Sequence, residues 1–206
     1  MVLILSILAG LINAAGQLQY IYYLVSKKII LNKATWGISA AMMCLQAGSY
    51  FYIVKTENPW IATTSIVVAV SFVFIFLYSF VYGRYAQLSS SDKVSLAVGV
   101  GVIALWQLTG DAKLANGILG VAGVVSFIPT IIGLFQGRLR EKPWPWFIGP
   151  CSYVLVVASI FFESGLSNPA AFAYPLIVGI VLNSFVGFQA IAQDRGYLPV
   201  PHSTKS

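Results

Sequence analysis

Charge is scarce in this chain of 206 residues. Only 9% of the residues are charged, and the six acidic residues all lie at or beyond the ends of long apolar segments. Proton relays and ion-coupled transporters usually carry buried ionisable groups at membrane depth, so this absence argues against both classes. It also removes the mid-membrane lysine that a retinal Schiff base requires.

Histidine and cysteine are almost absent as well. The one histidine, His202, lies in the polar C-terminal tail, and the two cysteines, Cys44 and Cys151, lie inside apolar segments. No cluster has the spacing of metal ligands, and no base stands beside a nucleophile. We therefore expect a protein that is not an enzyme and that uses neither metal nor cofactor. The two thiols are expected to be inert packing groups.

Apolar residues are abundant instead. They make up 58% of the chain, and the mean hydropathy is +0.84, more than a soluble domain of this length could bury in one core. The apolar runs are long and do not alternate, which favours membrane-spanning helices over a β-barrel. We predict an all-α integral membrane protein with seven transmembrane helices, in a cell (inner) membrane. The predicted spans are Val2–Val25, Ala34–Val54, Trp60–Tyr82, Val94–Leu108, Leu114–Phe135, Pro145–Phe162 and Ala170–Ala190.

The placement of basic residues gives the orientation. Seven spans put ten of the twelve Lys and Arg residues on one side and only Lys55 and Lys113 on the other, whereas omitting the fourth span gives six on each side. Because Lys and Arg concentrate in cytoplasmic loops, the N-terminus is expected outside and the C-terminus in the cytoplasm. The net charge of +6 then needs no nucleic-acid partner. The run Arg138–Lys142 is expected to contact anionic lipid of the bilayer.

Two parts of the chain superpose at a spacing of 110 residues. Trp36 falls on Trp146, and Asn58-Pro59 falls on Asn168-Pro169, in register with the hydropathy. A repeat of this length predicts a duplicated three-helix unit. The expected division is a first three-helix bundle over 1–83, a linker with the fourth helix over 84–110, a second bundle over 111–193 and a cytoplasmic tail over 194–206.

Uncharged polar residues inside the spans are the candidates for a site. Asn13, Gln17 and Tyr20 lie three or four residues apart, and therefore on one helical face. Gln46 and Asn183 are expected to converge with them near the bilayer midplane. Amides offer donors and acceptors, which suits a small neutral polar solute rather than an ion. The alternative is that the same amides only join helices to one another.

Aromatic residues and prolines add further candidates. Trp36 and Trp146 each open a span, where a tryptophan belongs either to the interfacial belt or to a gate or stacking wall. Tyr20 and Tyr153 are candidates of the same kind. Pro129 lies inside the fifth span, where it permits a kink that is either static or a hinge.

Three spans, one lone span and three more resemble the SWEET and PQ-loop transporter group. The resemblance implies two triple-helix bundles, a linker helix and alternating access at a central site, with Pro129 and Pro145 similar to the hinge prolines of the second bundle. The first bundle departs from the pattern, with Gln19 and Thr35 at those positions. Asn183 looks like the asparagine that helps to bind sugar in SWEETs. The matching segments are Ser126–Pro129, Trp144–Phe147, Tyr174–Pro175, Asn183 and Gln189.

The predicted function is facilitated transport of a small neutral polar solute, such as a sugar, by alternating access. One alternative is a vitamin-precursor or nucleoside-type carrier of the same plan, which Trp36, Trp144 and Trp146 keep open. Another is a membrane receptor or assembly protein on the same scaffold that transports nothing. The sequence leaves the solute and the oligomeric state, monomer or homo-oligomer, undecided.

Overall fold

The structure is a computed structural model that describes residues 1–53, 62–81, 89–109, 112–166 and 170–201. Some helical side chains lie outside the described part, as do Asn58-Pro59, Asn168-Pro169 and His202. The described residues form an all-helical fold with no strand, which confirms the predicted class. The elements are α1 (Val2–Val25), α2 (Lys33–Ile53), α3 (Ala62–Val81), α4 (Ser90–Thr109), α5 (Ala112–Phe135), α6 (Pro143–Ser164), α7 (Ala170–Tyr174), the π-helix η2 (Pro175–Leu182) and α8 (Asn183–Asp194).

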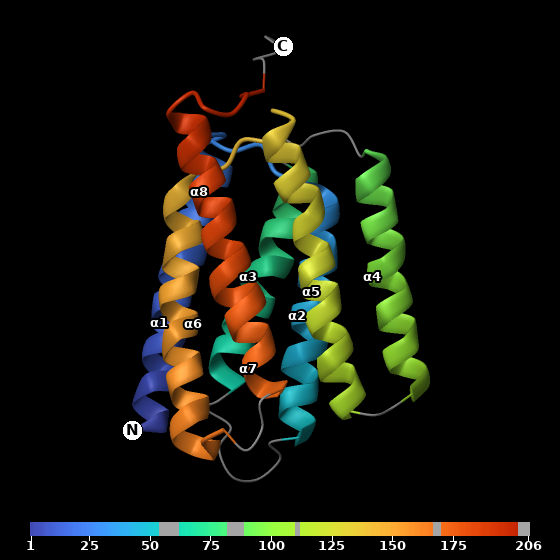
Figure 1. Ribbon diagram of the computed structural model, residues 1–206, viewed down its shortest axis with the longest axis vertical. Coiled ribbons are helices and arrows are strands. Elements are labelled where there is room, and N and C mark those ends of the chain that lie inside the picture. Colours follow the sequence, from blue (N-terminus) through green and yellow to red (C-terminus); the bar gives the residue numbers. More distant parts are fainter. Residues whose placement is uncertain (54–61, 82–88, 110–111, 167–169, 202–206) are drawn as a thin grey trace.

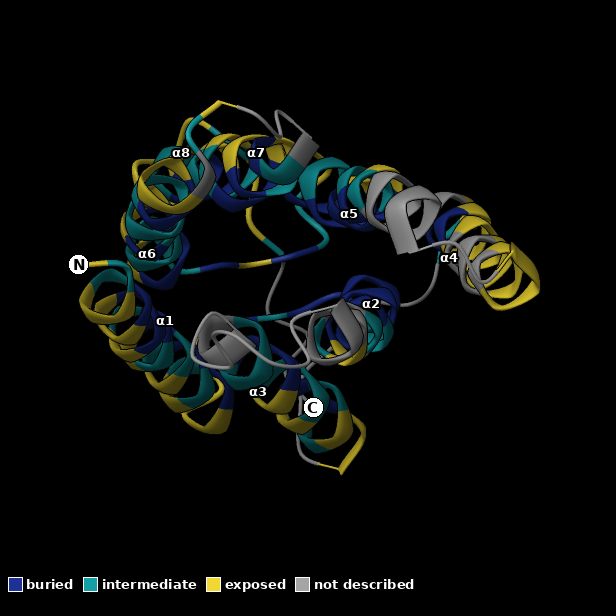
Figure 2. Ribbon diagram, turned by 90° about the horizontal axis from the view of Figure 1, so that it is seen from below, coloured by how far each residue is buried: buried dark blue, intermediate teal, exposed yellow. Residues whose placement is uncertain are grey.

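The helices run side by side (Figure 1) and form two layers when viewed along their length (Figure 2). In one layer α3 packs against both α1 and α2; in the other, η2 packs against both α5 and α6. The layers meet where α1 packs on α6 and where α2 packs on α5. Helix α4 lies at the edge, against α5 and α2.

Three helices are long and apolar enough to cross a membrane: Val2–Val25, Pro143–Glu163 and Ala171–Asp194. Two shorter apolar helices, Ser65–Val81 and Gly120–Phe135, accompany them. Most large apolar side chains on the outer faces are exposed, including Leu11, Leu77 and Val181. Exposed apolar faces on long helices are what a lipid environment requires, and they indicate an integral membrane protein.

The last predicted span differs from an ordinary α-helix. Its middle, Pro175–Leu182, is wound as a π-helix, which joins α7 to α8 without a break in the chain. Pro175 has no backbone N–H, so the regular ladder is interrupted where the π segment begins. The wider π turn is uncommon and is often found at functional sites. Sequence analysis predicted an α-helix here, because hydropathy does not distinguish the two windings.

The connections that follow α1 and α5 have the same backbone structure. Lys27 (φ 54°) and Gly137 (φ 65°), which are 110 residues apart, both adopt the left-handed conformation. Lys28 then donates to the carbonyl of Tyr23, and Arg138 donates to the carbonyl of Gly133, again 110 residues apart. This is the hydrogen bonding by which a left-handed residue closes a helix C-terminus.

Beyond these turns the two connections pair with each other. Ile30 N donates to Arg140 O (2.8 Å), and Arg140 N donates to Ile30 O (3.1 Å), forming an isolated antiparallel bridge. Side chains alternate along extended backbone, so the neighbours of the bridge point to one side. Ile29, Leu31, Leu139 and Glu141 are all at most 1% exposed.

Buried polar residues anchor the N-terminal end of α4. Asn32 Oδ1 accepts hydrogen bonds from the N–H groups of Ala34 and Thr35 at the start of α2, and its Nδ2 donates to Asp92 Oδ1 (2.8 Å). Asp92 is fully buried, and its other oxygen lies 3.8 Å from an Arg138 guanidinium nitrogen. One asparagine therefore joins the first helix pair, α4 and the connection after α5.

The run Arg138–Lys142 was expected to contact lipid, but most of it packs onto protein. Arg138 lies beside Asp92, Lys142 Nζ binds Asp194 (2.9 Å), and Glu141 is buried. Arg140 is the member that is exposed. The sequence-based expectation overlooked that carboxylates and the paired connection would take up these side chains.

Close helix contacts depend on small residues. A Cβ atom added to Gly179 would lie 2.3 Å from Cγ of Tyr153, and one added to Gly16 would lie 2.9 Å from a methyl group of Ile148. The cysteines play no such part: Cys44 and Cys151 are free and exposed, which contradicts their prediction as packing thiols. The interface is thus filled by aromatic and aliphatic side chains laid against glycine.

Replacing Gly179 by alanine is expected to destabilise the protein by about 1–3 kcal/mol, because the added methyl group overpacks against the Tyr153 ring. Gly120→Ala is the matched control, since nothing lies within 4 Å of the Cβ position there. Thermal unfolding in detergent should show a lower Tm for Gly179→Ala alone. Equal Tm values for the two variants would contradict this packing.

Candidate functional site

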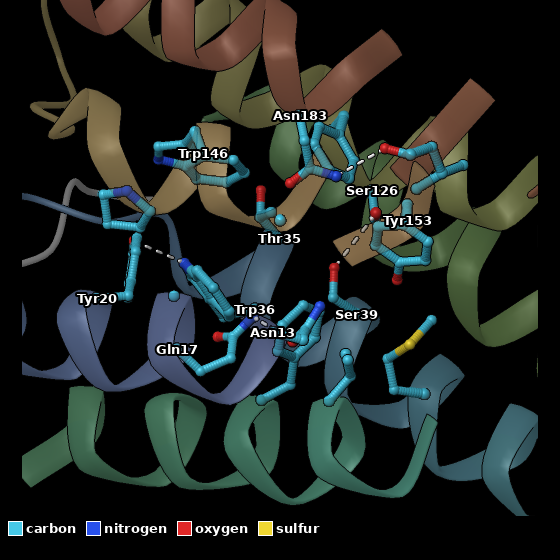
Figure 3. Close-up of a pocket in the computed structure, with 18 of the residues that line it drawn as sticks. Asn13, Gln17, Tyr20, Thr35, Trp36, Ser39, Ser126, Trp146, Tyr153 and Asn183 are labelled. Carbon is cyan, nitrogen blue, oxygen red and sulfur yellow. Dashed lines mark hydrogen bonds between the residues drawn. The ribbon is translucent and has the colours of Figure 1, made fainter. Parts of the chain in front are cut away.

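A cavity of about 50 Å³ lies between the two layers. Its walls come from α1, α2, α3, α5, α6 and the last helix, and among the described residues α4 contributes nothing. Figure 3 shows polar and aromatic side chains converging on it. The lining residues are Asn13, Gly16, Gln17, Tyr20, Thr35, Trp36, Ser39, Met42, Met43, Val68, Phe72, Ser126, Phe127, Pro145, Trp146, Gly149, Tyr153, Tyr174, Val178 and Asn183.

The structure brings most of the predicted site residues together at this cavity. Of the hinge candidates, Pro145 lines it, whereas Pro129 is buried in α5 outside the lining. Pro145 lies in the first turn of α6, where no backbone donor is lost, and a further proline, Pro150, lies deeper in the same helix. The side chain of Gln46 lies outside the described residues. The predicted residues that line the cavity are Asn13, Gln17, Tyr20, Trp36, Trp146, Tyr153 and Asn183.

Amide groups supply much of the polarity. Asn13 is 2% exposed; its Nδ2 donates to Ser152 (3.4 Å), and its Oδ1 accepts from Gln17 Nε2 (3.5 Å). Gln17 Oε1 is buried and has no hydrogen-bond partner among the described residues. Asn183 Nδ2 donates to the carbonyl of Val178 (2.7 Å), and its Oδ1 faces Gly149. A buried acceptor without a partner is costly, so Gln17 Oε1 is a position where a bound solute or water would donate.

Hydroxyl groups line the side where α2 meets α5. Ser39 Oγ donates to Ser126 Oγ (3.3 Å), and nearby Thr130 Oγ1 donates to Thr35 Oγ1 (3.0 Å). None of the four was among the predicted site residues. The helical spacing of Thr35 and Ser39, one turn apart after Trp36 had been chosen, is the signal that could have found the first pair.

One end of the cavity is built by four hydrogen-bonded side chains, which we call the Glu141 cluster: Tyr20, Trp36, Glu141 and Trp146. Trp36 Nε1 donates to Tyr20 Oη (3.2 Å), Tyr20 Oη donates to Glu141 Oε1 (2.9 Å), and Trp146 Nε1 donates to Glu141 Oε2 (3.2 Å). The rings also pack on each other, with centroids 4.6 Å apart for Tyr20 and Trp36 and 6.4 Å apart for the two tryptophans.

Glu141 has an unusual environment for a carboxyl group. Burial raises its pKa from the ordinary 4.5 to about 8, and the hydrogen bonds from Trp146 and Tyr20 lower it only in part. Sequence analysis placed this residue in a cytoplasmic loop and gave it no role. Its burial follows from the inward position beside the Ile30–Arg140 bridge, a pairing of distant segments that no local pattern predicts.

The cavity is lined in equivalent pairs. Fourteen of its twenty lining residues form seven pairs separated by 110 positions. The pairs share place but not chemistry: Gln17 lies opposite Phe127, and Ser39 lies opposite Gly149. The full set is Gly16/Ser126, Gln17/Phe127, Thr35/Pro145, Trp36/Trp146, Ser39/Gly149, Met43/Tyr153 and Val68/Val178.

Comparisons of the chain with protein-family models, with curated proteins and with solved structures found no match. The chemistry of the site therefore rests on its geometry. No charged side chain lines the cavity among the described residues, and its walls are aromatic rings, methionines, amides and hydroxyls. Such walls hold a neutral polar solute by hydrogen bonds and ring contacts.

Tyr20→Phe is expected to lower stability by about 1–3 kcal/mol, because it leaves Trp36 Nε1 and Glu141 Oε1 buried without their partner. Tyr22→Phe is the control, since the Tyr22 hydroxyl is bound only by an exposed lysine, Lys28. Thermal unfolding of both variants in the same detergent measures the difference. A Tyr20→Phe protein as stable as Tyr22→Phe would mean that the cluster contributes nothing.

Proposed function

We propose that the protein is a membrane facilitator that moves a small neutral polar solute by alternating access at the central cavity. The observation that carries the proposal is the cavity itself, placed between two groups of three helices and lined by seven residue pairs related by the 110-residue spacing. A site on such an axis can be reached from either side when the two groups rock against each other.

The proposal includes a topology. All seven apolar segments cross the membrane, as two parallel three-helix repeats joined by α4, with the N-terminus outside. The helix contacts support this arrangement: the 110-residue spacing converts the α1–α6 contact into the α5–α2 contact, and both are present. The paired connections after α1 and α5 then lie on the cytoplasmic side, where most Lys and Arg residues are expected. The resemblance to the SWEET and PQ-loop group points the same way.

The size of the cavity bears on the state of the transporter. A volume of about 50 Å³ holds roughly three to five water-sized groups, so a sugar or a nucleoside would enter only after the helix groups separate. The structure therefore corresponds to the narrow conformation in the proposed cycle. The cavity lining also favours a neutral solute, because a bare ion in apolar surroundings would lack a counter-charge.

The direct test is uptake by proteoliposomes of radiolabelled monosaccharides, nucleosides, vitamin precursors and neutral amino acids. Saturable uptake of one class is the expected result. Asn13→Ala and Asn183→Ala should each reduce this uptake several-fold without loss of expression, because each removes hydrogen-bonding groups from the cavity wall. Normal uptake by both variants would remove the two amides from the site.

A second variant separates blockage from misfolding. Gly149→Val is expected to fold, since a Cβ atom there meets only Asn183 Oδ1, at 3.8 Å, but its side chain enters the cavity and should abolish uptake. Gly120→Val on α5 is the matched control and should transport normally. Wild-type uptake by Gly149→Val would place the path elsewhere. No uptake of any solute by well-folded wild-type protein would favour a receptor or assembly role.

A further inference from the structure

The Glu141 cluster joins the two halves of the molecule at the end of the cavity. Tyr20 and Trp36 come from α1 and α2, whereas Glu141 and Trp146 come from the start of α6 and the residues before it. Glu141 directly follows Arg140, which is bonded to Ile30, and the other three members line the cavity. The cluster therefore lies between the backbone bridge and the solute site, so the halves cannot separate at this end while it is intact.

We propose that Glu141 is a proton-binding site that controls this end of the cavity: the neutral carboxyl group belongs to the closed cluster, and its ionisation favours opening. The proposal rests on the alternating-access function proposed above. The ligand is the proton itself, which is bound and released at one carboxyl oxygen without any other covalent change.

The surroundings of Glu141 suit an uncharged group. Its equivalent in the first half is Leu31, which is fully buried, so the carboxyl occupies a position that the other half fills with a hydrocarbon. Its neighbours Ile29 and Leu139 are buried and apolar. The described residues that bond to it are Tyr20 from α1 and Trp146 from α6, and only the first of these is titratable.

Cations near Glu141 in the sequence have other positions. Lys142 binds Asp194 of α8, Arg138 lies beside Asp92 of α4, and the side chain of Arg140 is exposed. Among the described residues, therefore, no Lys or Arg forms an ion pair with Glu141. A buried carboxylate without a counter-charge is expensive, whereas a buried neutral carboxyl that is fully hydrogen-bonded is not.

The cluster can satisfy the neutral form. With its proton on Oε1, the carboxyl donates to Tyr20 Oη, which also accepts from Trp36, while Oε2 keeps its bond from Trp146. The Tyr20 hydroxyl proton then turns away from Glu141. Loss of the proton returns the donor role to Tyr20 but leaves a negative charge at a site closed to water.

The direction of the pH effect follows from the two states. In the closed state the pKa of Glu141 is about 8; in an open, hydrated state it returns toward 4.5. The closed state is therefore favoured most below 4.5 and loses its advantage as the pH rises toward 8. Between those values opening releases one proton and closing takes one up. Because both events occur on the same side, the pH of that side regulates transport without driving it.

The test follows the access of water to Trp36 and Trp146. Trp60, Trp106 and Trp144 are replaced by phenylalanine, and quenching of the remaining fluorescence by acrylamide is measured from pH 5 to pH 9 in detergent. We expect quenching to rise at least twofold with pH, as a one-proton titration with its midpoint between about 4.5 and 8. Glu141→Gln mimics the neutral carboxyl and should remain protected throughout. Glu163→Gln, at an exposed acid near the end of α6, should titrate like the parent protein.

Two results would overturn the proposal: no titration in the parent protein, or an unchanged titration in Glu141→Gln. If the tryptophan-reduced protein does not fold, the same comparison is made with all tryptophans present, and the difference between wild type and Glu141→Gln carries the result. The uptake panel at pH 5.5 and pH 8 separates this proposal from the transport function. A Glu141-dependent titration without uptake retains the proton site and rejects transport. Uptake with the same pH profile in both proteins does the reverse.

Discussion

Two backbone hydrogen bonds between Ile30 and Arg140 determine how the halves of this protein meet. They hold the connections after α1 and α5 in extended form, side by side, and the alternation of side chains then sends Leu31 and Glu141 inward. Six residues beyond each bridged residue, Trp36 and Trp146 come within ring contact. The narrow end of the cavity, its aromatic wall and its buried carboxyl all follow from this one pairing.

Away from the bridge, the two layers are held apart or together by the size of single residues. Gly16 and Gly179 allow α1 and η2 to approach α6 to the point where a methyl group would not fit, whereas Gly149 faces open space beside Asn183. The same residue type thus closes the interface at some levels and leaves a hollow at another. Because the hollow has no charge among its described lining residues, its specificity must come from hydrogen bonds and shape.

Much of this was accessible from the sequence. The first span was predicted with the bounds that α1 has, and the three-and-four spacing of Asn13, Gln17 and Tyr20 placed them on the face that lines the cavity. Periodicity works there because the helix is long and regular. It fails for Glu141, whose burial depends on pairing with a segment about a hundred residues away, and for Pro175–Leu182, where hydropathy is the same for α and π windings. The exposed cysteines show the other limit, since apolar context does not tell lipid-facing from packed positions.

The π segment also decides which residues of the last helix can share one wall. Along an α-helix each residue turns by about 100°, so Tyr174 and Asn183, nine positions apart, would point in nearly opposite directions. The wider π winding turns less per residue, and both side chains line the cavity. The segment therefore acts as a built-in change of helical phase. Deleting one residue from it would restore a regular α-helix while rotating everything beyond, from Asn183 to Gln193, away from its present neighbours.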